Sequence, residues 1–173
     1  GLAFVYDALV GFDLKRDIKL IASGKVATAF DIYRALAIGA DGCNAARGFM
    51  LSLGCIQSLE CNKNICPTGV ATQKPELMKG LVVADKKQRV ANFHGETVKA
   101  FRELLAATGL KQSTQINRAH IHRNESQTIV ARYDESYPYL EPGSLLTPPY
   151  PAGWEVHMLE AHASTFARQL PSA

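Results

Sequence analysis

Three of the four cysteines lie within twelve residues, at Cys55, Cys61 and Cys66, and Pro67 directly follows the third. Thiolate sulfur is a soft ligand that suits zinc, copper(I) and iron–sulfur clusters. The C-x5-C-x4-C spacing differs from the paired C-x2–4-C spacing of zinc sites and from the C-x2-C-x2-C run of bacterial ferredoxins. Three thiolates with no fourth cysteine nearby fit a cubane that lacks one iron corner. The alternative is three buried or free thiols.

Two short loops that follow predicted strands carry residues suited to binding an anion. In the first loop, a glycine lets backbone N–H groups approach a phosphate closely, and a lysine adds positive charge. The second loop opens a helix, whose N-terminus favours anions, and its arginine can bind phosphate oxygens with two hydrogen bonds. A single Ser-Gly-Lys is more often an ordinary turn, but two such loops in succession favour a phosphate site. The candidate residues are Ser23, Gly24, Lys25, Asn44, Ala46 and Arg47.

The elements that must position these loops alternate between strand and helix. Short apolar runs predict two strands, over residues 17–22 and 41–45. Helical spacing of apolar residues predicts four helices, over residues 2–10, 27–38, 47–53 and 89–108. The order strand, helix, strand, helix is typical of an α/β fold with a parallel sheet.

After residue 110 the chain changes character. Tyrosine and proline cluster over residues 137–151, and proline at this density favours extended segments over regular structure. We therefore divide the chain into residues 1–110 and an irregular Pro/Tyr-rich tail over 111–173. The tail is expected either to be extended and pack along the barrel or a partner subunit, or to be partly disordered. Residues 155–170 are a candidate for a final helix.

Composition and charge argue against several classes of protein. Apolar residues make up 47% of the 173 residues and charged residues 20%, as in ordinary globular chains. The net charge of +3 comes from scattered basic residues, which argues against a nucleic-acid partner. No apolar run approaches the ~18 residues of a membrane span, and no signal peptide is readable. Four cysteines around one loop indicate a reducing compartment, and we expect a cytoplasmic protein.

The cysteine loop resembles the iron–sulfur loop of glutamate synthases. The resemblance rests on Gly54-Cys55-Ile56, on Cys61-Asn62 and on the run Cys66-Pro67-Thr68-Gly69-Val70-Ala71-Thr72-Gln73. It extends from about residue 18 to about residue 109. In that family a (β/α)8 barrel binds FMN, and a 3Fe–4S cluster lies beside it.

The resemblance implies that residues 1–110 are the last two β/α units of an FMN-binding TIM barrel, with the iron–sulfur loop at 54–67. Cys55, Cys61 and Cys66 would be the cluster ligands, and the two anion loops would hold the FMN phosphate. The family more often has Gly-Thr where this chain has Ala46-Arg47. Cys43 is expected to be a buried small hydrophobic residue. Asn62, Lys63 and Asn64 either donate hydrogen bonds to cluster sulfurs and, through the charge of Lys63, raise the potential of the cluster, or are solvated loop residues.

The implied activity is that of an oxidoreductase. Electrons from ferredoxin or another donor would pass through the cluster to FMN, which would reduce an imine of 2-oxoglutarate, with ammonia or glutamine as nitrogen source, to L-glutamate. A complete barrel typically has about 250 residues, so the rest of the barrel is an implied partner, and an oligomer is expected. One alternative is a non-catalytic subunit or remnant with a structural zinc on the three cysteines. The other is an FMN-dependent barrel that oxidises 2-hydroxy acids, in which the cysteine loop has no role.

Overall fold

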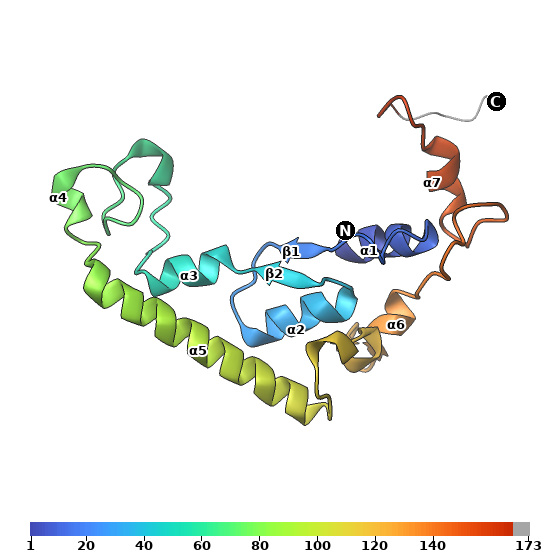
Figure 1. Ribbon diagram of the computed structural model, residues 1–173, viewed down its shortest axis with the longest axis horizontal. Helices are drawn as coiled ribbons and strands as arrows, with labels where there is room; N and C mark the ends of the chain where they lie inside the picture. Colours follow the sequence, from blue (N-terminus) through green and yellow to red (C-terminus); the bar gives the residue numbers. More distant parts are fainter. Residues whose placement is uncertain (168–173) are drawn as a thin grey trace.

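The computed structural model describes residues 1–167 and shows a mixed α/β arrangement (Figure 1). Strands β1 (Ile21–Ser23) and β2 (Gly42–Asn44) pair in parallel, with Ile21 opposite Gly42. Helix α2 (Ala29–Ile38) connects them, and helix α3 (Ala46–Ser52) follows β2. The predicted order of strand, helix, strand, helix is therefore confirmed. The sheet formed by residues 1–167 at this point has two strands and does not close into a barrel.

Both strands are shorter than predicted, and the first begins at residue 21 rather than 17. The preceding residues form turns, in which the Leu14 carbonyl accepts hydrogen bonds from the N–H groups of Asp17 and Ile18. An apolar pattern shows which residues could be buried in a strand. The length of the strand depends on how much neighbouring backbone pairs with it. Here that partner is limited to three residues of β2.

Helix α2 has clear sequence signals at both ends. The Thr28 side chain accepts the N–H of Asp31, and the Asp31 carboxylate accepts the N–H of Thr28, which together form a capping box. The helix ends at Gly39, whose φ of 128° lies in the region that favours glycine. A side chain at Gly39 would also overlap the ring of Tyr6, so the close approach of helix α1 (Leu2–Gly11) requires a glycine here.

Helix α5 (Val83–Ala107) is the longest element and packs on both α2 and α3 (Figure 1). Tyr33 of α2 lies in the buried cluster there and donates a hydrogen bond to Thr108, at 3.0 Å. The helix begins at residue 83 rather than at the predicted 89. Four of the five residues over 84–88 are good helix formers, and none of the five belongs to an apolar stripe. They extend the helix, but apolar periodicity does not predict them as helical.

The segment after α5 folds back onto the first two helices. It contains the turns η2 (Ser113–Gln115) and η3 (Arg118–His120), a hairpin of β3 (His122–Asn124) and β4 (Val130–Arg132), and helix α6 (Tyr133–Ser136). Ile116 and Ile121 of this segment are buried in the cluster around Tyr33 and Ala37 of α2. The prediction of an irregular tail is therefore wrong for residues 113–136, where contacts with α1 and α2 support short elements. It holds over residues 137–151, which contain neither helix nor strand.

Arg118 connects this segment to α1 and α2, and its side chain is completely buried. Its guanidinium donates to the Asp7 carboxylate of α1 at 2.8 Å and to the carbonyls of Tyr137 and Pro138 at 2.7 and 3.1 Å. The ring of Tyr139 lies 4.3 Å from the guanidinium carbon. One side chain thus joins three parts of the chain, and nothing in the local sequence pattern singles it out.

The final helix is shorter than expected. Helix α7 (Glu155–Glu160) stops well before residue 170; residues 161–167 are not helical, and 168–170 lie outside the described residues. Short helices need tertiary packing to be stable. Leu159 is 66% exposed, so α7 has little apolar burial to extend it. Within residues 1–167, none of the helices combines the length and apolar character needed to cross a bilayer.

Candidate functional site

The loops after β1 and β2 line one cavity of about 440 Å³, which also reaches the cysteine loop. Parallel strands bring their carboxyl ends to the same edge of a sheet, and α3 carries the chain from there to Cys55. All six residues of the predicted phosphate loops line this cavity, together with two of the three clustered cysteines. They are Ser23, Gly24, Lys25, Asn44, Ala46, Arg47, Cys55 and Cys61.

Backbone strain is concentrated around this cavity. Among the lining residues, Gly24 has a φ of 112°, and Lys25, Gln57 and Leu59 have φ values of 56°, 57° and 59°. Left-handed conformations cost of order 1–3 kcal/mol for a residue with a side chain and tend to gather at functional sites. No atom lies within 4 Å of the position that a Cβ on Gly24 would occupy, so the backbone of this loop is open to a ligand.

The charge of the cavity suits an anion. Lys25 and Arg47 line it, and its described lining includes no aspartate or glutamate. The remaining lining is largely apolar, with Met50, Leu51 and Leu59. A volume of this size with apolar walls and a few polar groups is typical of small-molecule sites. Helix α3 has seven residues, too few for a substantial dipole, so the positive charge comes chiefly from the two side chains.

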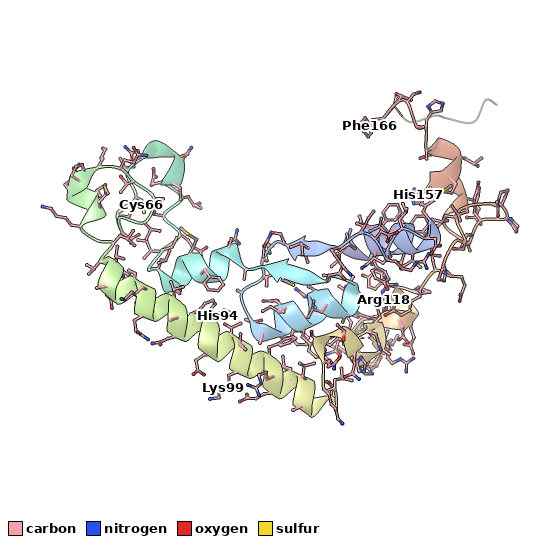
Figure 2. All side chains as sticks on the ribbon, viewed as in Figure 1. Cys66, His94, Lys99, Arg118, His157 and Phe166 are labelled. Carbon is pink, nitrogen blue, oxygen red and sulfur yellow. The ribbon has the colours of Figure 1, made fainter. Side chains whose placement is uncertain are left out.

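Cys55 and Cys61 face this cavity, whereas Cys66 lies deeper in the loop, between the turn η1 (Cys61–Lys63) and helix α4 (Pro75–Met78) (Figure 2). The Cys55 sulfur accepts the N–H of Gln57 at 3.4 Å. Cys61 is exposed, and Cys66 is 5% exposed. The loop therefore carries its thiols from an open cavity edge to a buried position.

Cys66 is held in a ring of hydrogen-bond donors. The Thr68 hydroxyl lies 3.4 Å from its sulfur. Together with the backbone N–H groups of Ala71, Thr68 and Val70, this hydroxyl holds the pKa of the Cys66 thiol down, at about 7, although burial opposes the shift. Hydrogen bonds of this kind stabilise a thiolate, which is the metal-binding form.

The ring of donors depends on close packing with α4. A side chain at Gly69 would overlap the Leu77 carbonyl, and one at Gly80 would come within 2.7 Å of the Thr68 carbonyl. Asn64 braces the other side of the loop, because its side-chain oxygen accepts the Gln73 N–H at 2.6 Å. The Asn64 side chain therefore makes its hydrogen bond within the loop. Lys63 pairs with Glu60 at 3.0 Å and is 61% exposed.

The structure places Cys43 and Cys66 in different environments. Cys43, expected to be buried, is only partly buried, and this partial burial raises its pKa and favours the neutral thiol. Cys66, in contrast, has the surroundings of a thiolate. Within residues 1–167, no three His, Cys, Asp or Glu side chains converge on a point where they could hold one metal ion. The soft sulfur donors, and the N–H groups directed at Cys55 and Cys66, fit an iron–sulfur cluster in chemistry.

Some lining residues were absent from the sequence-based site. Gln57 and Leu59 lie inside the cysteine loop and line the cavity in left-handed conformations. Neither residue type prefers that conformation, so no local signal points to them. Met50 and Leu51 belong to α3 and were predicted only as part of a helix.

Comparison with known proteins gives a family match and several relatives. A conserved region in glutamate synthase matches residues 1–111. The glutamate synthase large subunit-like protein YerD of Bacillus subtilis is 40% identical over 131 residues, which are 75% of this chain and 25% of YerD. The archaeal glutamate synthase [NADPH] of Methanocaldococcus jannaschii is 37% identical, over 56% of this chain and 19% of its own length.

A ferredoxin-dependent glutamate synthase from Antithamnion sp. is 32% identical over 118 residues, 67% of this chain and 7% of its own length. The chain thus spans a quarter or less of the length of these relatives.

Proposed function

Because the chain belongs to the glutamate synthase family, an oxidoreductase family, we propose that residues 1–110 form the last two β/α units of an FMN-binding TIM barrel. The support is the parallel β1–α2–β2–α3 order and the cavity at the carboxyl ends of both strands. In TIM barrels, active sites lie at that end, and the loops after strands seven and eight commonly bind phosphate. The remaining strands of the barrel would come from chain outside these 173 residues.

In this proposal the two loops hold the phosphate of FMN. The Gly24 and Lys25 backbone would donate hydrogen bonds, and Lys25 and Arg47 would supply positive charge. Ser23 and Asn44 end their strands at the cavity edge and would contribute polar contacts. The apolar side chains of Met50 and Leu51 would exclude water from the flavin. The family more often has Gly-Thr where this chain has Ala46-Arg47. With arginine at this position, the second loop would bind the phosphate mainly through positive charge.

Cys55, Cys61 and Cys66 would hold the 3Fe–4S cluster. The observation that carries the whole proposal is that one cavity joins both strand-end loops to Cys55 and Cys61, so a cluster and a flavin would be close neighbours. When bound, these two groups would supply one-electron transfer and hydride delivery to an imine formed from 2-oxoglutarate, giving L-glutamate. This chain's own part is to anchor the phosphate, provide thiolates and exclude water.

The electron donor is proposed to be a one-electron carrier such as ferredoxin, because an iron–sulfur cluster transfers electrons singly. The names of the relatives include both NADPH and ferredoxin, so similarity to these relatives supports an oxidoreductase but does not select the electron donor. The cysteine loop supports a donor that delivers one electron at a time. Ammonia or glutamine would supply nitrogen. The sequence-based alternative of a 2-hydroxy-acid oxidase is set aside, since the chain belongs to the glutamate synthase family.

The test is to purify the full-length protein anaerobically and to assay iron, zinc and flavin on one sample, with absorption and EPR spectra. We expect a brown protein with about three iron atoms per chain, an EPR signal in the oxidised state and bound FMN. A colourless protein with one zinc and no flavin would overturn the proposal and establish the structural-zinc alternative, whose closed site needs a fourth ligand.

A further inference from the structure

One lysine of α5 lies beside the cysteine loop and is largely shielded from solvent. The Lys86 side chain is 16% exposed. Its ammonium nitrogen lies 3.2 Å from the position that a Cβ on Gly54 would occupy, and Gly54 directly precedes Cys55. Lys86 is therefore a cation within one residue of the first proposed cluster ligand, although it is 31 positions further along the chain.

Gly54 makes this approach possible. Its φ of 102° lies in the region that favours glycine, and a side chain there would press on the Lys86 ammonium. The Arg89 guanidinium also lies 3.8 Å from the same position, but Arg89 is exposed. Two cations from successive turns of α5 thus point toward the start of the loop, and Lys86 is the one with little solvent to screen it.

The charge of Lys86 is only weakly balanced. Its ion-pair partner among the described residues is Asp85, which is 60% exposed and 3.7 Å away. Lys63, the lysine inside the loop itself, differs in both respects, because it is 61% exposed and pairs with Glu60 at 3.0 Å. Charges in contact with solvent are strongly screened, whereas partly buried charges act over longer distances.

We infer that Lys86 raises the reduction potential of the iron–sulfur cluster. Reduction adds one electron, and therefore one negative charge, to the cluster, and a neighbouring cation stabilises that added charge more than it stabilises the oxidised form. Net charge and solvent exposure are among the properties that set cluster potentials. This inference rests on the proposed function, since it requires a cluster on Cys55, Cys61 and Cys66. Through Lys86, helix α5 would affect the reduction potential of the cluster in addition to packing on α2 and α3.

The test is an EPR-monitored redox titration of the anaerobic full-length protein, after iron analysis of every sample. For Lys86→Met we expect about a tenfold lower ratio of reduced to oxidised cluster at the wild-type midpoint, which for one electron is a shift of about 59 mV. Lys86→Arg keeps the charge and should titrate like wild type. Lys63→Met is the matched control and should shift the ratio less than about twofold, as expected for an exposed pair.

A wild-type protein without iron would overturn the proposed function and this inference with it. A wild-type protein with iron, and a Lys86→Met variant with iron and an unchanged potential, would overturn this inference alone. If Lys86→Met is purified without iron, Lys86→Gln decides, because it removes the positive charge while keeping a polar side chain, and it should lower the potential in the same direction. An unchanged potential in Lys86→Gln would then reject the role of Lys86.

Discussion

A cysteine binds metal as the thiolate, and the cysteines of this chain differ in how strongly their surroundings favour that form. Cys66 receives hydrogen bonds from the Thr68 hydroxyl and from backbone N–H groups, which lower its pKa. Cys43 is only partly buried, and this burial, without such donors, raises its pKa. This contrast in pKa distinguishes Cys66 from Cys43 as a ligand candidate more sharply than sequence spacing alone.

Replacing Cys66 with alanine should remove the cluster. We expect the iron content of Cys66→Ala to fall to less than about a tenth of wild type, since even supporting groups change metal affinity about tenfold or more. Cys43→Ala is the matched control and should keep its iron. Iron assay and the visible spectrum of anaerobic samples measure both. Full iron in Cys66→Ala would remove this residue from the ligand set.

Lys25 and Arg47 are expected to carry much of the FMN affinity. A hydrogen bond to a charged group contributes about 1.5–3 kcal/mol, so Lys25→Ala and Arg47→Ala should each weaken FMN binding about ten- to a hundredfold. Lys87→Ala, on the exposed surface of α5, is the control. Flavin fluorescence during titration of the flavin-free protein gives the dissociation constants. Equal affinity in all three variants would contradict the phosphate assignment.

Between elements, Arg118 forms a fully buried connection. It is fully buried and contacts α1, the end of α2 and residues 137–139. Removing one partner of a buried ion pair typically costs about 3–5 kcal/mol, because the other charge stays buried without compensation. Here the carboxylate of Asp7, itself 7% exposed, would lose its partner.

Arg118→Met should therefore lower the free energy of unfolding by about 3–5 kcal/mol. Urea denaturation of the full-length protein measures this loss, and limited proteolysis should cut residues 111–145 faster than in wild type. Arg123→Met, at an exposed position in β3, serves as control and should leave both unchanged. An unaltered urea midpoint for Arg118→Met would mean that packing alone holds this segment on α1 and α2.

Asp41 directly precedes β2, and its side chain contacts the segment before β1. Its carboxylate accepts the Leu20 N–H at 2.7 Å and pairs with Lys15 at 2.9 Å. Partial burial opposes ionisation, but these hydrogen bonds and the charges of Lys15 and Lys19 hold the pKa of Asp41 below its ordinary value. A carboxyl with a lowered pKa in the folded state stabilises the protein above its unfolded pKa and loses that effect as the pH falls through the folded pKa.

Asp41→Asn should thus be less stable than wild type by about 1 kcal/mol at pH 7. The difference should shrink as the pH falls below about 4, the ordinary range for an aspartate. Urea denaturation of both proteins at several pH values is the measurement, with Asp17→Asn, at an exposed position, as control. A difference that stays constant down to pH 2 would contradict the ionic origin of this stabilisation.

Across the whole molecule, residues 1–167 leave a two-stranded parallel sheet with no strand beyond β1 or β2. Ile21 of β1 is 58% exposed, and Leu59 beside the cavity is 81% exposed. Parallel sheets are normally covered on both faces, and open strand edges promote association. This exposure is what we expect if further barrel strands complete the sheet.

The 173-residue chain expressed alone should therefore self-associate. We expect it to elute as large species in size-exclusion chromatography, and to become monodisperse when expressed with the preceding barrel region of the full-length protein. The apolar surface at Ile21 would be covered in the longer protein. A soluble monomer that unfolds cooperatively would contradict this prediction and show that β1 and β2 need no further strands.

Local patterns in the sequence were enough to indicate the order of α1, β1, α2, β2, α3 and α5, and the residues whose side chains could bind a metal or an anion, but not α4, the β3–β4 hairpin or α6. Apolar periodicity marks helices such as α2, and the Thr28–Asp31 pair and Gly39 mark its ends through short-range hydrogen bonds and backbone preference. The thiols of Cys55, Cys61 and Cys66 stand out because cysteine chemistry is specific and their spacing is short. Such signals depend on residues within a few positions of one another.

Other features could not be predicted from local sequence because they form only when the chain folds. They are the cavity, the hydrogen-bond donors around Cys66, and the burial of Lys86 and Arg118. Asp7 and Arg118 are 111 positions apart, and no local rule links a lysine of α5 to Gly54. Their energies come from desolvation and from contacts between distant segments, which exist only after the elements pack. Strand length also depended on pairing, because β1 and β2 extend only as far as their shared backbone hydrogen bonds allow.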